Sequence, residues 1–131
     1  KTGRMVSEVG LGTWQLGGGW GEVSEATAGE VLRAAADAGV TFLDMADVYG
    51  DGRSETLIGR FLKEVRTPFY VATKLGRFSP PGWPENFTRA AVRAHTEASL
   101  VAFQLPLDFA VPRANKKARA WEEAAGQFGE Y

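Results

Sequence analysis

The sequence predicts an α/β fold in which parallel strands alternate with helices. Three apolar segments typical of strands begin near Val9, Val40 and Phe69. Amphipathic segments lie between them, and the spacing of about 30 residues matches one strand-helix unit. Strands and helices that alternate in this way imply parallel strands joined by right-handed crossovers.

The first unit is a strand in "VGLGTW" followed by a helix. Ser24 suits the N-cap of that helix, and Gly39 suits its C-terminal stop. Apolar residues at helical spacing predict the buried face, which we expect to consist of Ala28, Val31, Leu32, Ala35 and Ala38.

The second unit is a strand in "VTFLD" followed by a helix for which Ser54 is the expected cap. The loop "YGDGRSE" reads most simply as a turn into this helix. Its apolar stripe is expected to consist of Leu57, Ile58, Phe61, Leu62 and Val65.

The third unit is a strand in "FYVATK" followed by a helix that begins after "PPGWPEN". Pro84 and Glu85 suit the first turn of that helix. The residues expected to face inward are Phe87, Ala91, Ala94 and Ala98.

The chain from Val101 onward has a less regular pattern. The segment "VAFQLPLDFAV" is expected to hold one or two short strands, broken at Pro106 because proline donates no ladder hydrogen bond. The segment "RANKKARAWEEAAGQF" is expected to be helical. We therefore divide the single domain into three strand-helix units over residues 1–100 and an unassigned strand and helix segment over 101–131.

The composition excludes several classes of function. With 15 Lys and Arg against 16 Asp and Glu, the net charge of −1 gives no reason to expect nucleic acid or an anionic membrane as a partner. The absence of cysteine excludes disulfides and thiolate catalysis, and one histidine cannot build a zinc site, so no metal is expected. No apolar run approaches the roughly 18 residues of a transmembrane helix, and the expected location is the cytoplasm.

Polar and aromatic residues follow all three predicted strands. The first strand leads to Thr13 and Trp14, the second to Asp44 with Tyr49 in the next loop, and the third to Lys74. The carboxyl ends of parallel strands lie along one edge, where α/β enzymes place their chemistry. We therefore expect these five residues to converge.

The chemistry of three of these residues fits together. A phenol is a poor proton donor near neutrality unless its anion is stabilised, which the Lys74 ammonium could do for Tyr49. Asp44 could supply the counter-ion that Lys74 needs. The three residues read as a general acid, although a structural ion pair beside a packed loop aromatic explains the pattern equally well.

The other candidate signals are weaker. The run "GLGTWQLGGGWGE" completes neither a dinucleotide-binding nor a phosphate-loop motif, so its glycines are interpreted as turns that bring Trp14 and Trp20 to the edge of the sheet. His95 is the only imidazole, but it lies in the middle of the third helix, and we expect it to pack or to face solvent.

Three segments of the sequence together resemble the N-terminal half of the aldo-keto reductase family. They are "KTGRMVSEVGLGTWQLGGGWG", "AADAGVTFLDMADVYGDGRSETLIGRFLKE" and "YVATKLGR", and the resemblance covers about residues 1–100. It implies a (β/α)8 TIM barrel, of which this chain represents only about half. It also implies reduction of aldehydes and ketones to alcohols by direct hydride transfer from NADPH, without a metal. NADH stays open, because the residues that would contact the ribose phosphate are not identified.

The resemblance assigns a role to each strand-end residue. Tyr49 would donate the proton to the carbonyl oxygen, and Lys74 and Asp44 would tune it. Thr13, Trp14 and Asp44 would lie by the nicotinamide, and Trp14, Trp20 and Tyr49 would border the carbonyl substrate.

The chain departs from the family pattern in three ways. Nothing after Leu100 supplies the histidine with which the fourth strand of the family normally ends. Met45 replaces a small polar residue, and later cofactor-binding strands are missing. A barrel of this type needs roughly 250 residues, so we expect part of a longer enzyme. The alternative is a non-catalytic module of the same scaffold that binds nucleotide or a partner chain.

Overall fold

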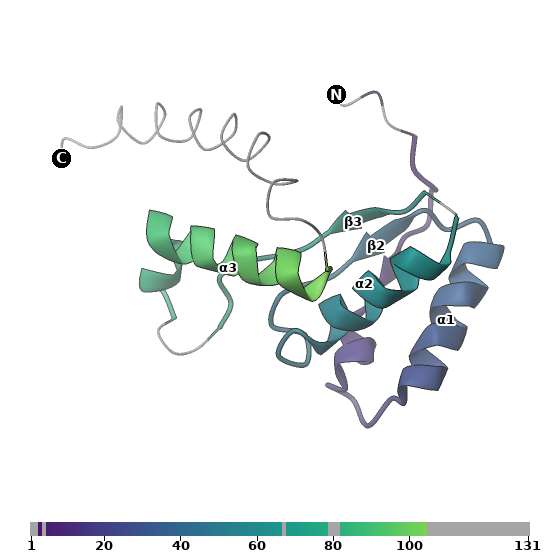
Figure 1. The fold of residues 1–131 in the computed structure, drawn as a ribbon, viewed down its shortest axis with the longest axis horizontal. Coiled ribbons are helices and arrows are strands. Elements are labelled where there is room, and N and C mark those ends of the chain that lie inside the picture. Colours follow the sequence, from purple (N-terminus) through teal and green to yellow (C-terminus); the bar gives the residue numbers. More distant parts are fainter. Residues whose placement is uncertain (1–2, 4, 67, 79–81, 105–131) are drawn as a thin grey trace.

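The computed structural model describes residues 3, 5–66, 68–78 and 82–104. These residues form a three-stranded parallel sheet in the order β1-β2-β3 (Figure 1). The strands are β1 (Leu11–Gly12), β2 (Phe42–Asp44) and β3 (Tyr70–Ala72). In the central register, Leu43 lies opposite both Leu11 and Val71. The predicted order of parallel strands is confirmed.

Helices follow each strand. They are α1 (Glu25–Asp37), α2 (Arg53–Glu64) and α3 (Arg89–Ala102), with short 3₁₀ turns η1 (Trp14–Gly17) and η2 (Glu85–Phe87). Figure 1 shows α1 and α2 side by side over one face of the sheet, and α3 on the side of α2 away from α1. The alternation of strands and helices is therefore the one that the sequence predicts.

Helix α1 begins and ends as predicted. The Ser24 hydroxyl oxygen accepts a hydrogen bond from the Thr27 amide at 3.0 Å, which satisfies one of the free donors of the first turn. Gly39 follows the helix with a φ of +80°, a conformation that costs glycine little. Ala28 and Leu32 are buried in the core, whereas Val31 lies on the exposed side.

Helix α2 begins at a different residue from the one predicted. Its N-cap is Gly52, with a φ of +83°, and Ser54 lies inside the first turn with no exposed surface. The prediction of Ser54 as the cap is wrong because its hydroxyl is used in a tertiary contact with Thr13. Leu57, Ile58 and the rest of the predicted stripe pack in or against the core.

Helix α3 also begins later than predicted. Thr88 caps it by accepting a hydrogen bond from the Ala91 amide at 3.2 Å, while Pro84 and Glu85 belong to the separate turn around η2. The helix continues through Val101 and Ala102, so the expected strand does not begin at Val101. The remainder of that predicted strand and the final predicted helix lie outside the described residues.

The inward face of α3 is not the predicted one. Phe87 is 51% exposed, and Ala94 and Ala98 are also exposed. The buried residues are instead Ser99 and, just past the helix, Phe103. Periodicity identified a helix here but selected the wrong face, because alanine can occupy either side of a helix at little cost.

The core lies between the sheet and the two helices that cover it. Its buried members are Leu16, Ala28, Leu32, Leu43, Met45, Leu57, Ile58, Phe61 and Phe103. Gly59 allows α2 to approach the end of α3 closely, since a Cβ at this position would lie 2.7 Å from Phe103 Cα. Close backbone contact therefore fixes how these two helices cross.

Backbone pairing continues beyond the strand ends. The Thr13 amide donates to Asp44 O at 3.0 Å, and the Asp47 amide donates to Lys74 O at 3.0 Å. The loops that follow the three strands are thus held side by side. This arrangement places their side chains along the predicted edge of the sheet.

Candidate active site

Asp44 and Lys74 form an ion pair at the ends of neighbouring strands. Lys74 Nζ donates to Asp44 Oδ1 at 2.6 Å and to the carbonyl oxygen of Met45 at 3.1 Å. The two side chains are 49% and 42% exposed, so the pair lies open at the edge of the sheet. The ammonium is thus held at a fixed place without being enclosed.

The pairing keeps Lys74 charged. The hydrogen bond to Asp44 raises the pKa of the Lys74 ammonium above its ordinary value, and partial burial opposes that rise. The charge of Asp44 and the nearby Tyr49 side chain add to the increase. Because the pair is partly exposed, the surrounding water screens its contribution to stability.

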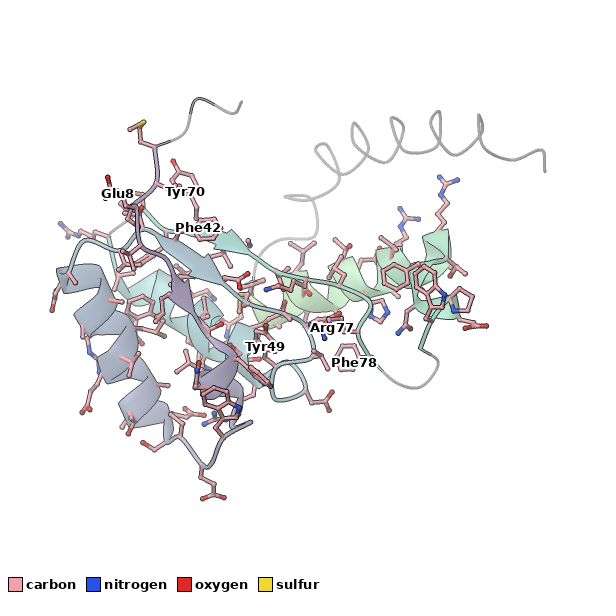
Figure 2. The ribbon with its side chains drawn as sticks, turned by 180° about the vertical axis from the view of Figure 1, so that it is seen from behind. Glu8, Phe42, Tyr49, Tyr70, Arg77 and Phe78 are labelled. Carbon is pink, nitrogen blue, oxygen red and sulfur yellow. The ribbon has the colours of Figure 1, made fainter. Side chains whose placement is uncertain are left out.

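Tyr49 lies beside this ion pair. Its residue belongs to the turn between β2 and α2, and the centroid of its ring is 5.7 Å from Lys74 Nζ. The ammonium donates hydrogen bonds to Asp44 and to the Met45 carbonyl oxygen, and the Tyr49 ring lies beside it. Figure 2 shows Tyr49 at the end of the sheet opposite to Tyr70.

Two tryptophans extend the aromatic surface around Tyr49. The Trp14 and Tyr49 rings stack with centroids 6.1 Å apart, and the Trp20 ring lies 5.4 Å from that of Trp14 in a tilted arrangement. Trp14 is 50% exposed and Trp20 is 73% exposed. The structure therefore brings together both predicted tryptophans, each of them at least half exposed.

Thr13 supports this edge from beneath. It is 1% exposed, and its hydroxyl donates to Asp44 O at 3.1 Å. The Ser54 hydroxyl in turn donates to Thr13 O at 3.0 Å. The side chain of Thr13 is thus bonded to protein groups, and its expected place by the nicotinamide stays a prediction.

The turn that carries Trp14 is held by α2. The Arg53 guanidinium donates to the carbonyl oxygens of Leu16 and Val23, at 2.5 Å for Val23. Gly17 packs against the next turn so closely that a Cβ there would lie 2.6 Å from the Gly50 amide nitrogen. These contacts explain why glycines occur here without a phosphate-binding motif.

Two buried carboxylates were not among the predicted site residues. Asp47 Oδ2 accepts a hydrogen bond from the Gly76 amide at 3.1 Å, and Glu55 Oε1 accepts one from the Thr73 hydroxyl at 2.7 Å. These two hydrogen bonds therefore hold the chain before and after Lys74, at Thr73 and at Gly76. The sequence signal was present in "DMADVYGDGRSE", but an acidic residue in a turn usually faces solvent.

Burial changes the chemistry of Glu55. This residue is 2% exposed, and desolvation raises the pKa of its carboxyl group. The hydrogen bond from Thr73 and the proximity of the Ser99 hydroxyl lower that pKa in part, and the charge of Asp47 raises it further. Glu55 therefore retains a proton to higher pH than an exposed glutamate does.

His95 has a packing contact, as expected from its position in the helix. Its ring stacks on Phe78 with centroids 5.8 Å apart. Its Nδ1 lies 3.9 Å from Asp47 Oδ2, which is longer than a hydrogen bond. His95 does not contact the Asp44, Tyr49 and Lys74 group in any of the interactions described.

Comparison with known proteins supports the resemblance noted in the sequence. The family model described as "Aldo/keto reductase family" matches residues 8–111. The chain belongs to the aldo/keto reductase family. The match includes Thr13, Asp44 and Lys74, which lie at or just after the strand ends of this aldo/keto reductase segment.

Two curated relatives illustrate how much of the family this chain spans. It is 46% identical over 76 residues to the aldo-keto reductase YhdN of Bacillus subtilis, covering 56% of this chain and 23% of that protein. It is 39% identical over 95 residues to pyridoxal 4-dehydrogenase of Microbacterium luteolum, covering 66% of this chain and 28% of that protein. The chain thus spans about a quarter of the length of these relatives.

The fold agrees with solved structures of the family. An aldo-keto reductase from Klebsiella pneumoniae in complex with NADPH superposes with a TM-score of 0.61 at 29% identity. The match covers 76% of this chain and 32% of that one. The three strand-helix units therefore have the aldo-keto reductase TIM-barrel fold that the resemblance implied, and they correspond to about a third of the barrel where about half was expected.

No cluster of three or more His, Cys, Asp or Glu residues in the described part of the chain could hold a metal ion. None of the helices within residues 3, 5–66, 68–78 and 82–104 combines the length and the apolar character that crossing a membrane requires.

Proposed function

We propose that this chain supplies the proton-donating part of the active site of an NAD(P)H-dependent reductase of aldehydes and ketones. The observation that carries the proposal is the 2.6 Å ion pair between Lys74 and Asp44 beside the Tyr49 ring. An ion pair with a purely structural role would not require an aromatic hydroxyl next to it at an open edge.

In this proposal, Tyr49 is the general acid. As its proton passes to a substrate carbonyl oxygen, negative charge develops on the phenolic oxygen. The Lys74 ammonium, kept protonated by Asp44, stabilises that charge. Asp44 acts by holding Lys74 in place and charged.

The residues present fit one end of a nicotinamide cofactor. Asp44 offers a half-exposed carboxylate that can accept hydrogen bonds from ribose hydroxyls, and Trp14 offers an exposed flat ring at the same edge. The cofactor would supply the hydride to the carbonyl carbon. Thr13 would contribute through Asp44, since its own hydroxyl is bonded within the protein.

The substrate would lie against the aromatic surface. Trp14 and Trp20 are largely exposed beside Tyr49, and exposed aromatic rings bind apolar groups attached to a carbonyl. The orientation they impose would bring the carbonyl oxygen within reach of the phenol.

The test is NADPH consumption, followed by absorbance, with 4-nitrobenzaldehyde as substrate. Tyr49→Phe should reduce kcat by about 10²- to 10⁴-fold, the usual contribution of a positioned general acid. The KM for the aldehyde should change little, because the ring and its stacking on Trp14 are kept.

The matched control is Tyr70→Phe, which removes the same hydroxyl at the other end of the sheet (Figure 2). It should leave kcat within a factor of about two. Unchanged turnover in Tyr49→Phe, or an equal loss in both variants, would show that Tyr49 is not the proton donor.

A further inference from the structure

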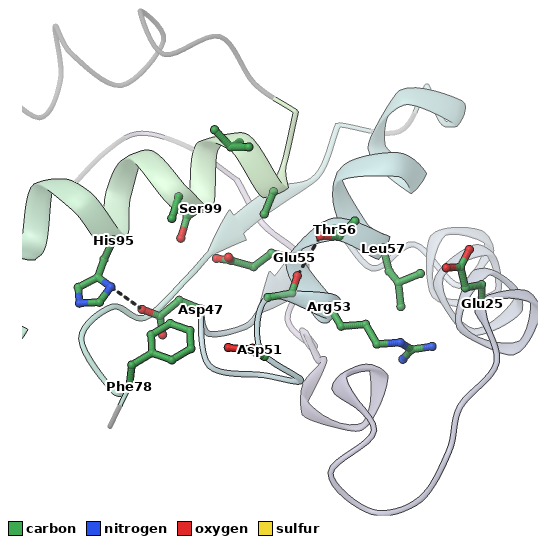
Figure 3. A pocket seen from close by; sticks show the side chains of 14 residues that line it. Glu25, Asp47, Asp51, Arg53, Glu55, Thr56, Leu57, Phe78, His95 and Ser99 are labelled. Carbon is green, nitrogen blue, oxygen red and sulfur yellow. Dashed lines mark hydrogen bonds and ion pairs between the residues drawn. The ribbon is translucent and has the colours of Figure 1, made fainter. Parts of the chain in front are cut away.

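A second candidate site lies between α2 and α3. A groove of about 480 Å³ opens there (Figure 3), which is within the size range of small-molecule pockets. We call it the α2–α3 groove. Asp44, Tyr49, Lys74 and both tryptophans of the candidate active site are absent from its lining.

Most of the accessible surface of the groove is apolar, although most of the residues that line it are polar or charged. The apolar residues include Leu57 from α2, Phe78 from the loop after β3, and Ala98, Val101 and Ala102 from α3. Such a surface favours a compact hydrocarbon or aromatic group, because its burial removes apolar area from water.

The inner end of the groove carries three buried polar side chains. Asp47 is 4% exposed, Ser99 is 5% exposed and Glu55 is 2% exposed. Asp47 Oδ1 and Ser99 Oγ have no hydrogen-bond partner within the described residues. Leaving a buried polar group unpaired is costly, so a ligand that pairs with these atoms offsets that cost.

These three side chains come from different elements and converge. Figure 3 shows Asp47 from the loop after β2, Glu55 from α2 and Ser99 from α3 directed toward the same space. The effects of Asp47 and Ser99 on the pKa of Glu55 agree with that proximity.

Of the basic side chains in the lining, Arg53 is bonded elsewhere and His95 reaches Asp47 only at ion-pair distance. Arg53 lines the groove but commits its guanidinium to the Leu16 and Val23 carbonyls. His95 Nδ1 stands 3.9 Å from Asp47 Oδ2, the oxygen that already accepts from Gly76. A further carboxylate residue, Asp51, lies in the lining, whereas Glu25 there is paired with Arg60 at 3.0 Å. The groove therefore favours a cation.

The cation that fits best is an ammonium group. The described residues hold no cluster suited to a metal ion. A primary ammonium has three N–H donors, and the inner end offers three acceptors: Asp47 Oδ1, Ser99 Oγ and the Glu55 carboxyl group.

We propose that the α2–α3 groove binds a small molecule that carries a primary ammonium on a short aryl or alkyl group. The ammonium pairs with Asp47, Glu55 and Ser99, and the hydrocarbon part covers Leu57 and Phe78. The proposal does not depend on carbonyl reduction, because none of the residues proposed for that reaction lines the groove.

The test is titration of the 131-residue chain with benzylamine, followed by NMR of the backbone amides. We expect saturable shifts at Glu55 and Ser99, and binding at least tenfold weaker for benzyl alcohol, which keeps the ring without the charge. Equal binding of the two compounds, or no saturable shift at these amides, overturns the proposal.

Two variants locate the binding groups. Ser99→Ala should weaken benzylamine binding by about fivefold to tenfold, the effect of one hydrogen bond to a charged group. Glu55→Gln should weaken it by about tenfold or more. Thr96→Ala removes a hydroxyl on the same helix that bonds to Val92 O and is the control, with unchanged binding expected. Wild-type affinity in both Ser99→Ala and Glu55→Gln overturns the assignment.

A further titration distinguishes a free amine from the lysine side chain of a partner protein, since both carry a primary ammonium group. Nα-acetyl-lysine N-methylamide represents the lysine. We expect it to bind more weakly than benzylamine, because its backbone amides have no place on the apolar lining. Tighter binding of the lysine compound overturns the small-molecule assignment.

Discussion

Lys74 Nζ lies 2.6 Å from Asp44 Oδ1; Asp44 ends β2, and Lys74 lies in the loop that follows the adjacent parallel strand β3. No local pattern joins them, since 30 residues separate them in the chain. The parallel pairing of β2 with β3 alone makes them neighbours. The chemistry of this edge therefore depends on sheet register.

Asp44→Asn should lower the pKa of Lys74 toward its ordinary value of 10.5, because the hydrogen bond to the Asp44 carboxylate is the main cause of the increase. NMR titration of the lysine side chain measures it. The free energy of unfolding near neutral pH should fall by about 1 kcal/mol or less, since partly exposed ion pairs contribute little. Asp37→Asn, at the end of α1, should leave the pKa of Lys74 unchanged, and an unshifted Lys74 in Asp44→Asn would contradict the pairing.

Glu55→Gln should change how stability depends on pH. Burial raises the pKa of Glu55 in the folded state above 4.5. As pH rises through that value, the unfolded chain releases the proton first, so ionisation favours unfolding. The free energy of unfolding of the wild type should therefore fall, relative to that of Glu55→Gln, from about pH 4.5 upward until the folded-state pKa is passed.

Urea unfolding of both proteins across this pH window measures the difference. Gln keeps an oxygen that can accept from Thr73, so the variant isolates the effect of the charge. A constant difference at every pH would show that Glu55 is not perturbed.

Gly59→Ala should destabilise the fold. A Cβ there would lie 2.7 Å from Phe103 Cα, and the backbone of the chain after α3 would have to move. We expect a loss of about 1–3 kcal/mol, which exceeds the gain in helix propensity of about 1 kcal/mol. Urea unfolding provides the measurement.

Gly29→Ala in α1 is the matched control. Its added Cβ would meet only the end of the Arg33 side chain, at 3.1 Å, and that side chain can turn away. The control should be neutral or stabilising by up to about 1 kcal/mol. Equal effects of the two substitutions would contradict the close crossing of α2 and α3.

Arg53→Ala should loosen the turn that carries Trp14. Its guanidinium bonds to Leu16 O and Val23 O, and losing two such charged hydrogen bonds should cost about 2–4 kcal/mol. Tryptophan fluorescence should shift to longer wavelength as Trp14 moves away from Tyr49. Arg60→Ala, which removes an exposed ion pair with Glu25, should alter neither stability by more than about 1 kcal/mol nor fluorescence.

The sequence by itself determined the alternation of strands and helices, because apolar periodicity is a local property. It determined both ends of α1, since Ser24 and Gly39 act on their own neighbours in the chain. It also placed Asp44, Tyr49 and Lys74 after successive strands, which was enough to predict that they lie near one another.

Only the tertiary structure decided which residues are buried and which distant residues they bond to. Serine is a common helix N-cap, but the Ser54 hydroxyl instead donates to the carbonyl oxygen of Thr13, which follows β1. Asp47 and Glu55 look like turn residues in the sequence but are buried by α3, whose inward face an alanine-rich pattern does not specify. Capping and periodicity act over a few residues, whereas burial and hydrogen-bond partners depend on contacts between distant segments.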